Sequence, residues 1–125
     1  MRLLLDTHAL LWWLTDFEKL SAATHDAIAG GEYDILVSHA VIWEILIKSA
    51  KGKLHPPADI AERCAVENFA LLPIALSHIE ETAQLPLLHG DPFDRIMVAQ
   101  ARCENLVLVS NDRLITQYDV TVLPA

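Results

Sequence analysis

Four acidic residues stand where apolar segments of this chain begin or end, and their side chains are the leading candidates for chemistry. Asp6 directly follows the run "RLLL", and Asp112 follows "LVLVSN". Glu44 lies in "VSHAVIWEILIK", and Asp94 lies in "HGDPFDRIMVAQA". Carboxylate oxygens are the ligands that Mg²⁺ and Mn²⁺ prefer. Such an ion neutralises a phosphate oxygen and lowers the pKa of bound water, so the four acids predict metal-assisted phosphodiester hydrolysis.

Each acid also has an ordinary structural interpretation. Asp6 and Asp112 suit helix N-caps, and Asp94 suits the positive end of a helix dipole. Glu44 lies one helical turn from Lys48, with which it can pair. Taken together, however, carboxylates about 5 Å apart repel by about 3 kcal/mol per pair at an effective dielectric of about 20. A cluster of them therefore needs a cation or a group of Lys and Arg side chains.

The two aspartates of "DPFD" divide the work at one helix start. Asp91 is interpreted as the N-cap, and Pro92 suits the first helical position because its φ angle is fixed. Asp94 then lies in the first turn and is left free to face a metal ion.

Short apolar runs alternate with segments of helical period, which predicts an α/β protein. The predicted strands are Arg2–Leu5, Asp34–Ser38, Ala70–Ile74, Leu106–Ser110 and Val120–Leu123. The predicted helices are Ala9–Leu14, Ala22–Ala29, Ala40–Ala50, Asp59–Asn68, His78–Leu85, Pro92–Cys103 and Arg113–Gln117. The strands are rich in Leu, Ile and Val without strict alternation, which is typical of strands covered on both faces. We expect a three-layer α/β/α sandwich around a mostly parallel sheet of four or five strands.

Start and stop signals support several of these helices. Ser21 and the capping box "SHIE", from Ser77 to Glu80, mark helix starts, and Gly30-Gly31 marks a helix end.

The expected sheet would bring the four acids together. Ligands of open α/β sheets bind beyond the carboxyl ends of the strands. Asp6 and Asp112 leave the sheet at that edge, and Glu44 lies on the helix that the second strand feeds. A crossover helix that runs back against the strands begins at the same edge, which adds Asp94.

Composition limits the class of protein. The 125 residues suit one domain, residues 1–125, and 53% are hydrophobic. Asp6 interrupts the apolar start, so we expect no signal peptide, and no segment approaches the roughly 20 apolar residues of a membrane span. A soluble, cytoplasmic protein is expected. The formal charge of −8 argues against unassisted binding to a polyanion, so a phosphate substrate needs local help such as a metal ion.

Cysteine and histidine are not expected to hold a metal. Cys64 and Cys103 are far apart, and we expect reduced, buried thiols. The six histidines show no tight ligand spacing.

The fragments "LLLDTHALLWWL", "VSHAVIWEILIKSAKGKL", "LPI", "HGDPFDRIMVAQA" and "LVLVSND", in this order, resemble the PIN-domain nucleases, in particular the VapC-type toxins of bacterial toxin–antitoxin pairs. Asp6, Glu44, Asp94 and Asp112 match the acids of that family. Ser110 departs mildly from the family's Thr-x-Asp pattern but keeps the hydroxyl, and it is a candidate for contact with the substrate. The resemblance implies Mg²⁺- or Mn²⁺-dependent cleavage of RNA, a homodimer, and a cognate antitoxin whose tail enters the acidic groove.

Several neighbouring side chains have open roles. Thr7 could bind a carboxylate or a phosphate, or only its local backbone. Arg95 and Arg113 could hold an RNA phosphate or orient a carboxylate, or could be solvated surface residues.

Lys48, Lys51 and Lys53 form a basic stretch that suits either the approach of RNA or a solvated helix end. Trp12 and Trp13 point about 100° apart on a helix, so one of them is expected at the dimer or antitoxin surface.

Two other classes of function remain open from the residues. A receiver-like phosphoacceptor domain also places acids at this sheet edge, but it needs a lysine after the late strand, and "LVLVSNDRLI" has none. A metal-free protein-binding module would use the same acids as caps.

Overall fold

A five-stranded parallel sheet forms the centre of the computed structural model, which describes all residues from 1 to 125. The strands are β1 (Arg2–Leu5), β2 (Asp34–Ser38), β3 (Ala70–Leu72), β4 (Val107–Val109) and β5 (Val122–Leu123). Their order across the sheet is β3-β2-β1-β4-β5. The predicted strands are all present, and the parallel sheet expected from their apolar composition is confirmed.

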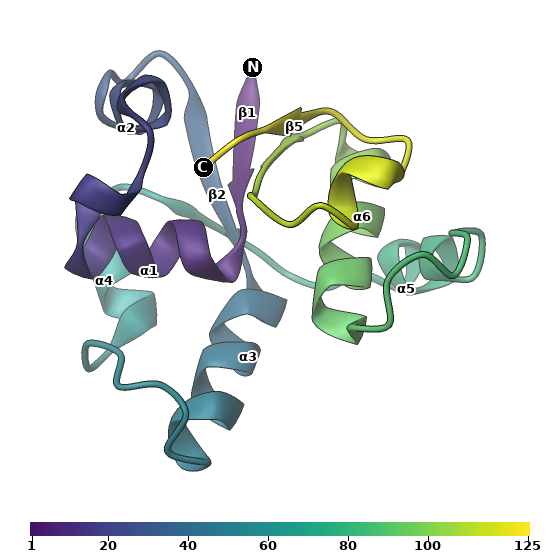
Figure 1. Cartoon of the computed structure of the whole chain (residues 1–125), viewed down its shortest axis with the longest axis horizontal. Coiled ribbons are helices and arrows are strands. Elements are labelled where there is room, and N and C mark those ends of the chain that lie inside the picture. The colour runs from purple at the N-terminus through teal and green to yellow at the C-terminus, as the bar shows by residue number, and fades with distance from the viewer.

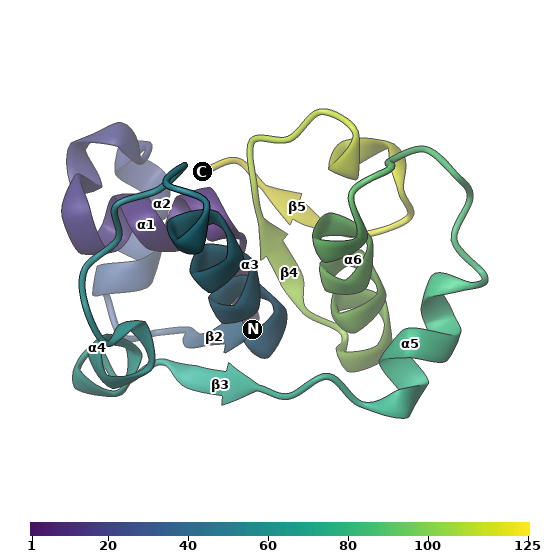
Figure 2. The same cartoon turned by 90° about the horizontal axis from the view of Figure 1, so that it is seen from below.

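Helices cover the sheet on both sides, as expected for a three-layer α/β/α fold. They are α1 (Thr7–Thr15), α2 (Ala22–Ala29), α3 (His39–Ala50), α4 (Ile60–Val66), α5 (Leu76–Thr82) and α6 (Pro92–Glu104), with 3₁₀ turns η1 (Phe17–Lys19) and η2 (Ile115–Gln117). Figures 1 and 2 show α1, α2 and α4 to one side of the sheet, and α5 and α6 to the other. The helix α3 extends past the carboxyl edge of the strands and contacts both α1 and α6.

The central strands are buried because both of their faces pack against helices. Leu4 and Leu5 of β1 and Val37 of β2 are completely buried, as is Leu108 of β4. This apolar centre holds β1 firmly between β2 and β4, so the residues that leave its carboxyl end have a fixed position.

Local capping explains where several helices begin. Ser21 accepts a hydrogen bond from Thr24 N at the start of α2, and Gly30 ends that helix, as predicted. Asp91 accepts one from Phe93 N at 2.8 Å, which confirms it as the N-cap of α6. The predicted capping box at Ser77 is wrong. α5 begins at Leu76, and the buried ring of His78 accepts the hydrogen bond of Ala75 N through Nδ1.

Three other expectations need correction. β3 ends at Leu72 because Pro73 has no N–H to continue the ladder. The predicted helix Arg113–Gln117 is only the 3₁₀ turn η2. Cys103 is exposed rather than buried because it lies on the outer face of α6, although Cys64 is buried as expected. No helix is long and apolar enough to cross a lipid bilayer.

The C-terminus of α6 provides a test of the fold that is remote from the acidic residues. Asn105 caps this helix in the left-handed conformation, with φ 59°. Asn105→Gly should keep or raise the stability, whereas Asn105→Ala should lower the free energy of unfolding by about 1 kcal/mol, since Cβ is strained there without a polar side chain. Urea denaturation of the three proteins checks this. Equal stability of the Ala and Gly variants would contradict the capping role.

Candidate metal centre at the carboxyl edge of the sheet

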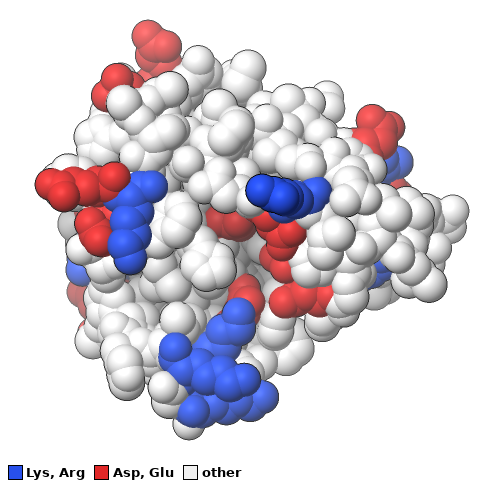
Figure 3. Space-filling view, viewed as in Figure 1, with Lys and Arg blue, Asp and Glu red and all other residues white.

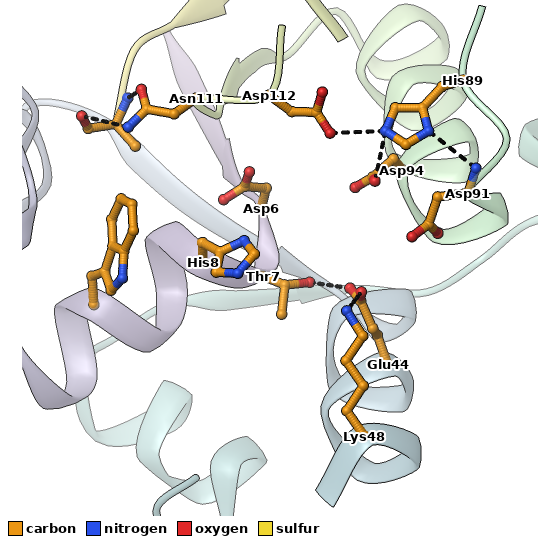
Figure 4. A pocket seen from close by; sticks show the side chains of 12 residues that line it. Asp6, Thr7, His8, Glu44, Lys48, His89, Asp91, Asp94, Asn111 and Asp112 are labelled. Atoms are coloured by element: carbon orange, nitrogen blue, oxygen red, sulfur yellow. Dashed lines mark hydrogen bonds and ion pairs between the residues drawn. The ribbon is translucent and has the colours of Figure 1, made fainter. Parts of the chain in front are cut away.

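A cavity of about 450 Å³ opens at the carboxyl ends of β1 and β4. These neighbours flank the point where the strand order reverses, which is where open α/β sheets bind ligands. The acids that line the cavity are Asp6, Glu44, Asp91, Asp94 and Asp112. Figure 4 shows them around one space, although they come from β1, α3, α6 and the segment after β4. The structure therefore brings together all four acids that the sequence singled out.

Strand register positions Asp6. Leu5 lies opposite Val109, and Asp6 N donates to Val109 O at 3.1 Å, so Asp6 lies beside Ser110 of the next strand. The carboxylate caps α1 by accepting from Ala9 N at 2.8 Å. Burial raises the pKa of Asp6, and hydrogen bonds from Ser110 and Ala9 act against that rise. Asp6 can therefore cap α1 and serve as a site acid at once, because the cap uses only one of its two carboxylate oxygens.

Glu44 enters the cavity from α3 with partners of its own. Its side chain is buried and accepts hydrogen bonds from the Thr7 hydroxyl and from Lys48 Nζ, the latter at 2.6 Å. The hydrogen bond to Glu44 raises the pKa of Lys48, which keeps the ammonium charged. The ordinary interpretation of Glu44, a pair with Lys48, is therefore present, and Lys48 contributes positive charge to the cavity.

Asp94 is the most perturbed acid of the site. It lies in the first turn of α6 and is left free because Asp91 makes the cap. Burial, and to a lesser extent the charges of Asp91, Glu44 and Asp112, raise the pKa of Asp94 to about 7, while His89 acts in the opposite direction. Burial first and neighbouring negative charge second therefore favour the neutral form of this carboxyl group.

His89 joins the site although no sequence pattern predicted it as a site residue. Its Nε2 lies 2.8 Å from Asp112 Oδ2 and 3.0 Å from Asp94 Oδ2. Its Nδ1 accepts from Asp91 N at 3.0 Å, so the hydrogen of the neutral ring is on Nε2 and points at the two carboxylates. Partial burial acts to raise the pKa of Asp112, but hydrogen bonds from His89 and Leu114 N outweigh it and keep that pKa below its usual value.

No ligand spacing reveals His89, because it acts through residues that are adjacent only in the fold. The one signal available in the sequence is its position just before the capping aspartate in "HGDPFD".

A second layer of hydrogen bonds holds the segment that carries His89. Tyr118 is buried, and its hydroxyl oxygen accepts from His89 N at 2.9 Å and from Arg95 at 3.1 Å. Arg95 also donates to Pro86 O at 2.9 Å and to Thr82 O at 2.8 Å. Arg95 does not line the acidic cavity, so the structure places it away from the phosphate contact that the sequence suggested. Its guanidinium fastens the chain between α5 and α6 instead.

Thr7 and Ser110 do line or adjoin the cavity, but their hydroxyls already serve its acids. Thr7 donates to Glu44, and Ser110 hydrogen-bonds Asp6 while accepting from Asp112 N at 3.0 Å. Their predicted contact with substrate stays a prediction.

The two adjacent tryptophans of α1 are both half-buried and pack against the core. Trp12 lines the acidic cavity, while the Trp13 indole donates to Glu67 at 3.1 Å. Neither is among the exposed apolar side chains. The expectation that one of them lies at the dimer or antitoxin surface stays a prediction. Trp43 of α3 is the exposed tryptophan, 58% accessible.

The donor set fits a hard divalent cation. Five carboxylates line the cavity against one lysine, and the side chains of His89, Asp94 and Asp112 already offer ligand atoms within 4.8 Å of one another. Because the proton of His89 points at the carboxylates, oxygen atoms are the available ligands. An all-oxygen set with no thiolate suits Mg²⁺ or Mn²⁺. The residues that would hold such an ion are Asp6, Asp94 and Asp112. Glu44 would join them once its ion pair with Lys48 is broken.

The PIN-domain family model matches residues 3–120. Since the match covers nearly the whole chain, this protein belongs to the PIN-domain family, and its resemblance to the PIN-domain nucleases is confirmed. That membership also decides against the receiver-like alternative. No curated protein sequence matches the chain.

Solved structures with the same fold include several VapBC assemblies. A chain of VapBC2 from Rickettsia felis, bound to a DNA fragment from its promoter, is 13% identical with TM-score 0.73, and the match covers 98% of each chain. DNA-bound VapBC from Salmonella typhimurium is 14% identical with TM-score 0.68, covering 98% of this chain and 97% of that one. VapBC-1 from nontypeable Haemophilus influenzae is 17% identical with TM-score 0.66, covering 98% and 97%. At these identities the likeness shows the fold.

The raised pKa of Asp94 predicts a pH-dependent stability. Between its usual value of 3.8 and about 7, the folded protein holds a proton that the unfolded chain releases, so this carboxyl destabilises the fold increasingly as the pH rises. In EDTA, Asp94→Asn should therefore be more stable than the unchanged protein by up to about 4 kcal/mol above pH 7, and by little near pH 4. Urea denaturation across this range measures the difference.

Asp34→Asn is the matched control, because Asp34 is exposed at the start of β2 and should show no such trend. A difference between Asp94→Asn and the unchanged protein that stays constant from pH 4 to pH 8 would refute the assigned pKa.

The Tyr118 hydroxyl should matter for the His89 segment. Tyr118→Phe removes the acceptor of two hydrogen bonds and should cost about 1 kcal/mol of folding free energy. It should also speed hydrogen exchange at the His89 amide. Tyr33→Phe is the control, since Tyr33 is half-buried and its hydroxyl makes no hydrogen bond. If both variants behave alike in denaturation and exchange, Tyr118 does not position His89.

Proposed function

We propose that this protein is a divalent-metal-dependent endoribonuclease that acts as the toxin of a toxin–antitoxin pair. One observation carries the proposal: carboxylates from four separate segments converge in one cavity whose own cations do not balance them. Nothing in passive folding favours that arrangement, because the acids repel each other. A bound divalent cation would relieve the repulsion and give the cluster a use.

The acids have different parts in this proposal. Asp6 and Asp94 are the primary ligands, since each has a carboxylate oxygen that no cap occupies. Asp112 and Glu44 complete the cluster by direct or water-mediated contact. When bound, Mg²⁺ or Mn²⁺ would neutralise a phosphate oxygen and lower the pKa of the attacking water.

The other polar side chains orient these acids and the substrate. His89 Nε2–H lies within hydrogen-bond distance of both Asp94 and Asp112 and so holds the two carboxylates close together. The Ser110 hydroxyl links Asp6 to the backbone of Asp112, since it hydrogen-bonds the Asp6 carboxylate and accepts from Asp112 N. Lys48 Nζ, held at the cavity wall by Glu44, is the cation that an approaching phosphate oxygen would meet and could hydrogen-bond.

The biological setting follows from the relatives rather than from the cavity. The structures that share this fold include VapBC complexes. We infer that this chain has a cognate antitoxin with a basic tail that neutralises the acidic cavity, and that it forms a homodimer. The formal charge of −8 is consistent with a basic partner segment.

Asparagine substitutions separate capping from catalysis. Asn is as good an N-cap as Asp, so Asp6→Asn should preserve α1 while it removes the metal ligand. Asp6→Asn and Asp94→Asn should each reduce Mn²⁺-dependent cleavage of total RNA to the level of an EDTA control. Gel electrophoresis of the RNA measures cleavage, and circular dichroism checks the fold.

The same samples distinguish an enzyme from a metal-free binding module. Mn²⁺ at 100 times its dissociation constant should stabilise the unchanged protein by about 2.7 kcal/mol, and neither variant should respond comparably. Asp34→Asn serves as the control with full activity. Cleavage by either site variant at the normal rate, or a melting temperature of the unchanged protein that ignores both Mn²⁺ and Mg²⁺, would defeat the proposal.

A further inference from the structure

Most basic side chains of this protein already have partners. The chain has nine Lys and Arg residues. Those with a hydrogen bond or ion pair are Arg2, Lys19, Lys48, Arg63, Arg95 and Arg102. Those with none are Lys51, Lys53 and Arg113. All of the unpaired ones are exposed.

The unpaired cations lie near the acidic cavity but do not line it. Lys51 and Lys53 follow the end of α3, the helix that carries Glu44 and Lys48. Figure 3 shows basic side chains gathered over this end of α3, next to a hollow lined by acidic ones. Arg113 directly follows Asp112, which Figure 4 shows across the cavity from Lys48. In a protein with formal charge −8, the free positive charge is thus concentrated where a phosphate chain would have to arrive.

A closed turn fixes the two lysines. Gly52 between them has φ +72°, a conformation that favours glycine, and Lys53 N donates to Lys48 O at 2.9 Å. The turn therefore ends α3 and keeps the backbone of Lys51 and Lys53 at this end of the helix. Lys51 lies about 10 Å from Glu44 along the helix axis, so the pair is close enough to bind phosphates next to the one in the cavity.

An exposed aromatic ring lies on the same helix. Trp43 precedes Glu44, is 58% accessible, and meets Phe93 edge to face with ring centroids 5.3 Å apart. Ile47 and Lys51 follow it at helical spacing, one and two turns along α3. At 58% accessibility, much of the indole surface stays open to solvent. An open indole face beside phosphate-binding lysines is the usual arrangement for stacking an unpaired base.

We propose that a single-stranded RNA leaves the cavity along α3, with its phosphates on Lys51 and Lys53 and an unpaired base stacked on Trp43. This inference rests on the proposed nuclease function, since it extends the substrate beyond the cleaved bond. A nucleic-acid strand fits better than a second copy of the chain. A two-fold contact centred here would bring Lys51 and Lys53 against their own copies, like charge against like charge. The centres of protein interfaces are also depleted in lysine.

The inference predicts how RNA binding changes with salt and with substitution. Binding of a fluorescein-labelled, mixed-sequence single-stranded RNA is followed by fluorescence anisotropy in EDTA, where no cleavage occurs. Lys51→Ala combined with Lys53→Ala should lower the slope of log affinity against log salt by about 1.4, since each lost phosphate contact contributes about 0.7. Lys19→Ala is the control, because Lys19 is exposed but pairs with Asp16, and it should leave the slope unchanged.

Trp43 is tested separately. Trp43→Ala should weaken binding of the single-stranded RNA by about fivefold to a hundredfold, Trp43→Phe should recover part of the loss, and binding of a double-stranded RNA should change little. Leu46→Ala is the matched control, since Leu46 is 60% accessible on the same helix. Light scattering on each variant reports whether the oligomeric state has changed.

The outcomes separate this inference from the proposed function. If both sets of variants bind the RNA normally while the unchanged protein cleaves it in Mn²⁺, the path along α3 is wrong and the nuclease stands. If Trp43→Ala dissociates an oligomer and leaves RNA affinity intact, Trp43 belongs to a protein interface and the stacking is overturned. If RNA binding depends on Lys51, Lys53 and Trp43 but Mn²⁺ produces no cleavage, the surface stands and the proposed function fails.

Discussion

The repulsion among buried carboxylates is the constraint on which the rest of this molecule depends. Asp6, Asp94 and Asp112 face one another at the switch point of a parallel sheet, where burial has removed much of the water that would screen them. Without a bound cation, the protein relieves the repulsion by limited means: the proton of His89 Nε2, the ammonium of Lys48, and a pKa of about 7 at Asp94. A divalent cation would take over the part of each of these groups in balancing the negative charge. Without it, the site lowers the stability of the fold, and for the same reason it suits a metal ion.

Caps and site acids are not competing explanations in this fold. Asp6 begins α1 and Asp91 begins α6, and both helices start at the edge of the sheet where the cavity opens. One carboxylate oxygen of Asp6 satisfies the helix terminus and the other is not used by the cap, whereas at α6 capping falls to Asp91 and the cavity-facing position to Asp94. The second aspartate of "DPFD" is therefore explained by the division between closing a helix and facing the cavity.

The charge distribution separates the place of chemistry from the surface that would hold the rest of a substrate. The cavity is acidic and suits a cation, while the unpaired lysines lie beyond it at the end of α3. A phosphate chain meets favourable charge at the rim and would need a metal ion to enter the centre. The same arrangement suits a basic protein tail, which needs no metal to enter an acidic cavity.

The sequence alone determined the alternation of strands and helices, the parallel sheet, and the acids that meet at its edge, because apolar periodicity and strand ends are local properties of the chain. The sequence also predicted the helix caps at Ser21 and Asp91, because capping depends on residues that are close in the chain. Only the tertiary structure decided that His89 bridges Asp94 and Asp112, that Arg95 fastens a loop instead of facing the cavity, and that Trp43 rather than Trp12 or Trp13 is exposed. These depend on the packing of α3, α6 and the segment after β4 against one another. No spacing in the sequence encodes such contacts between distant segments.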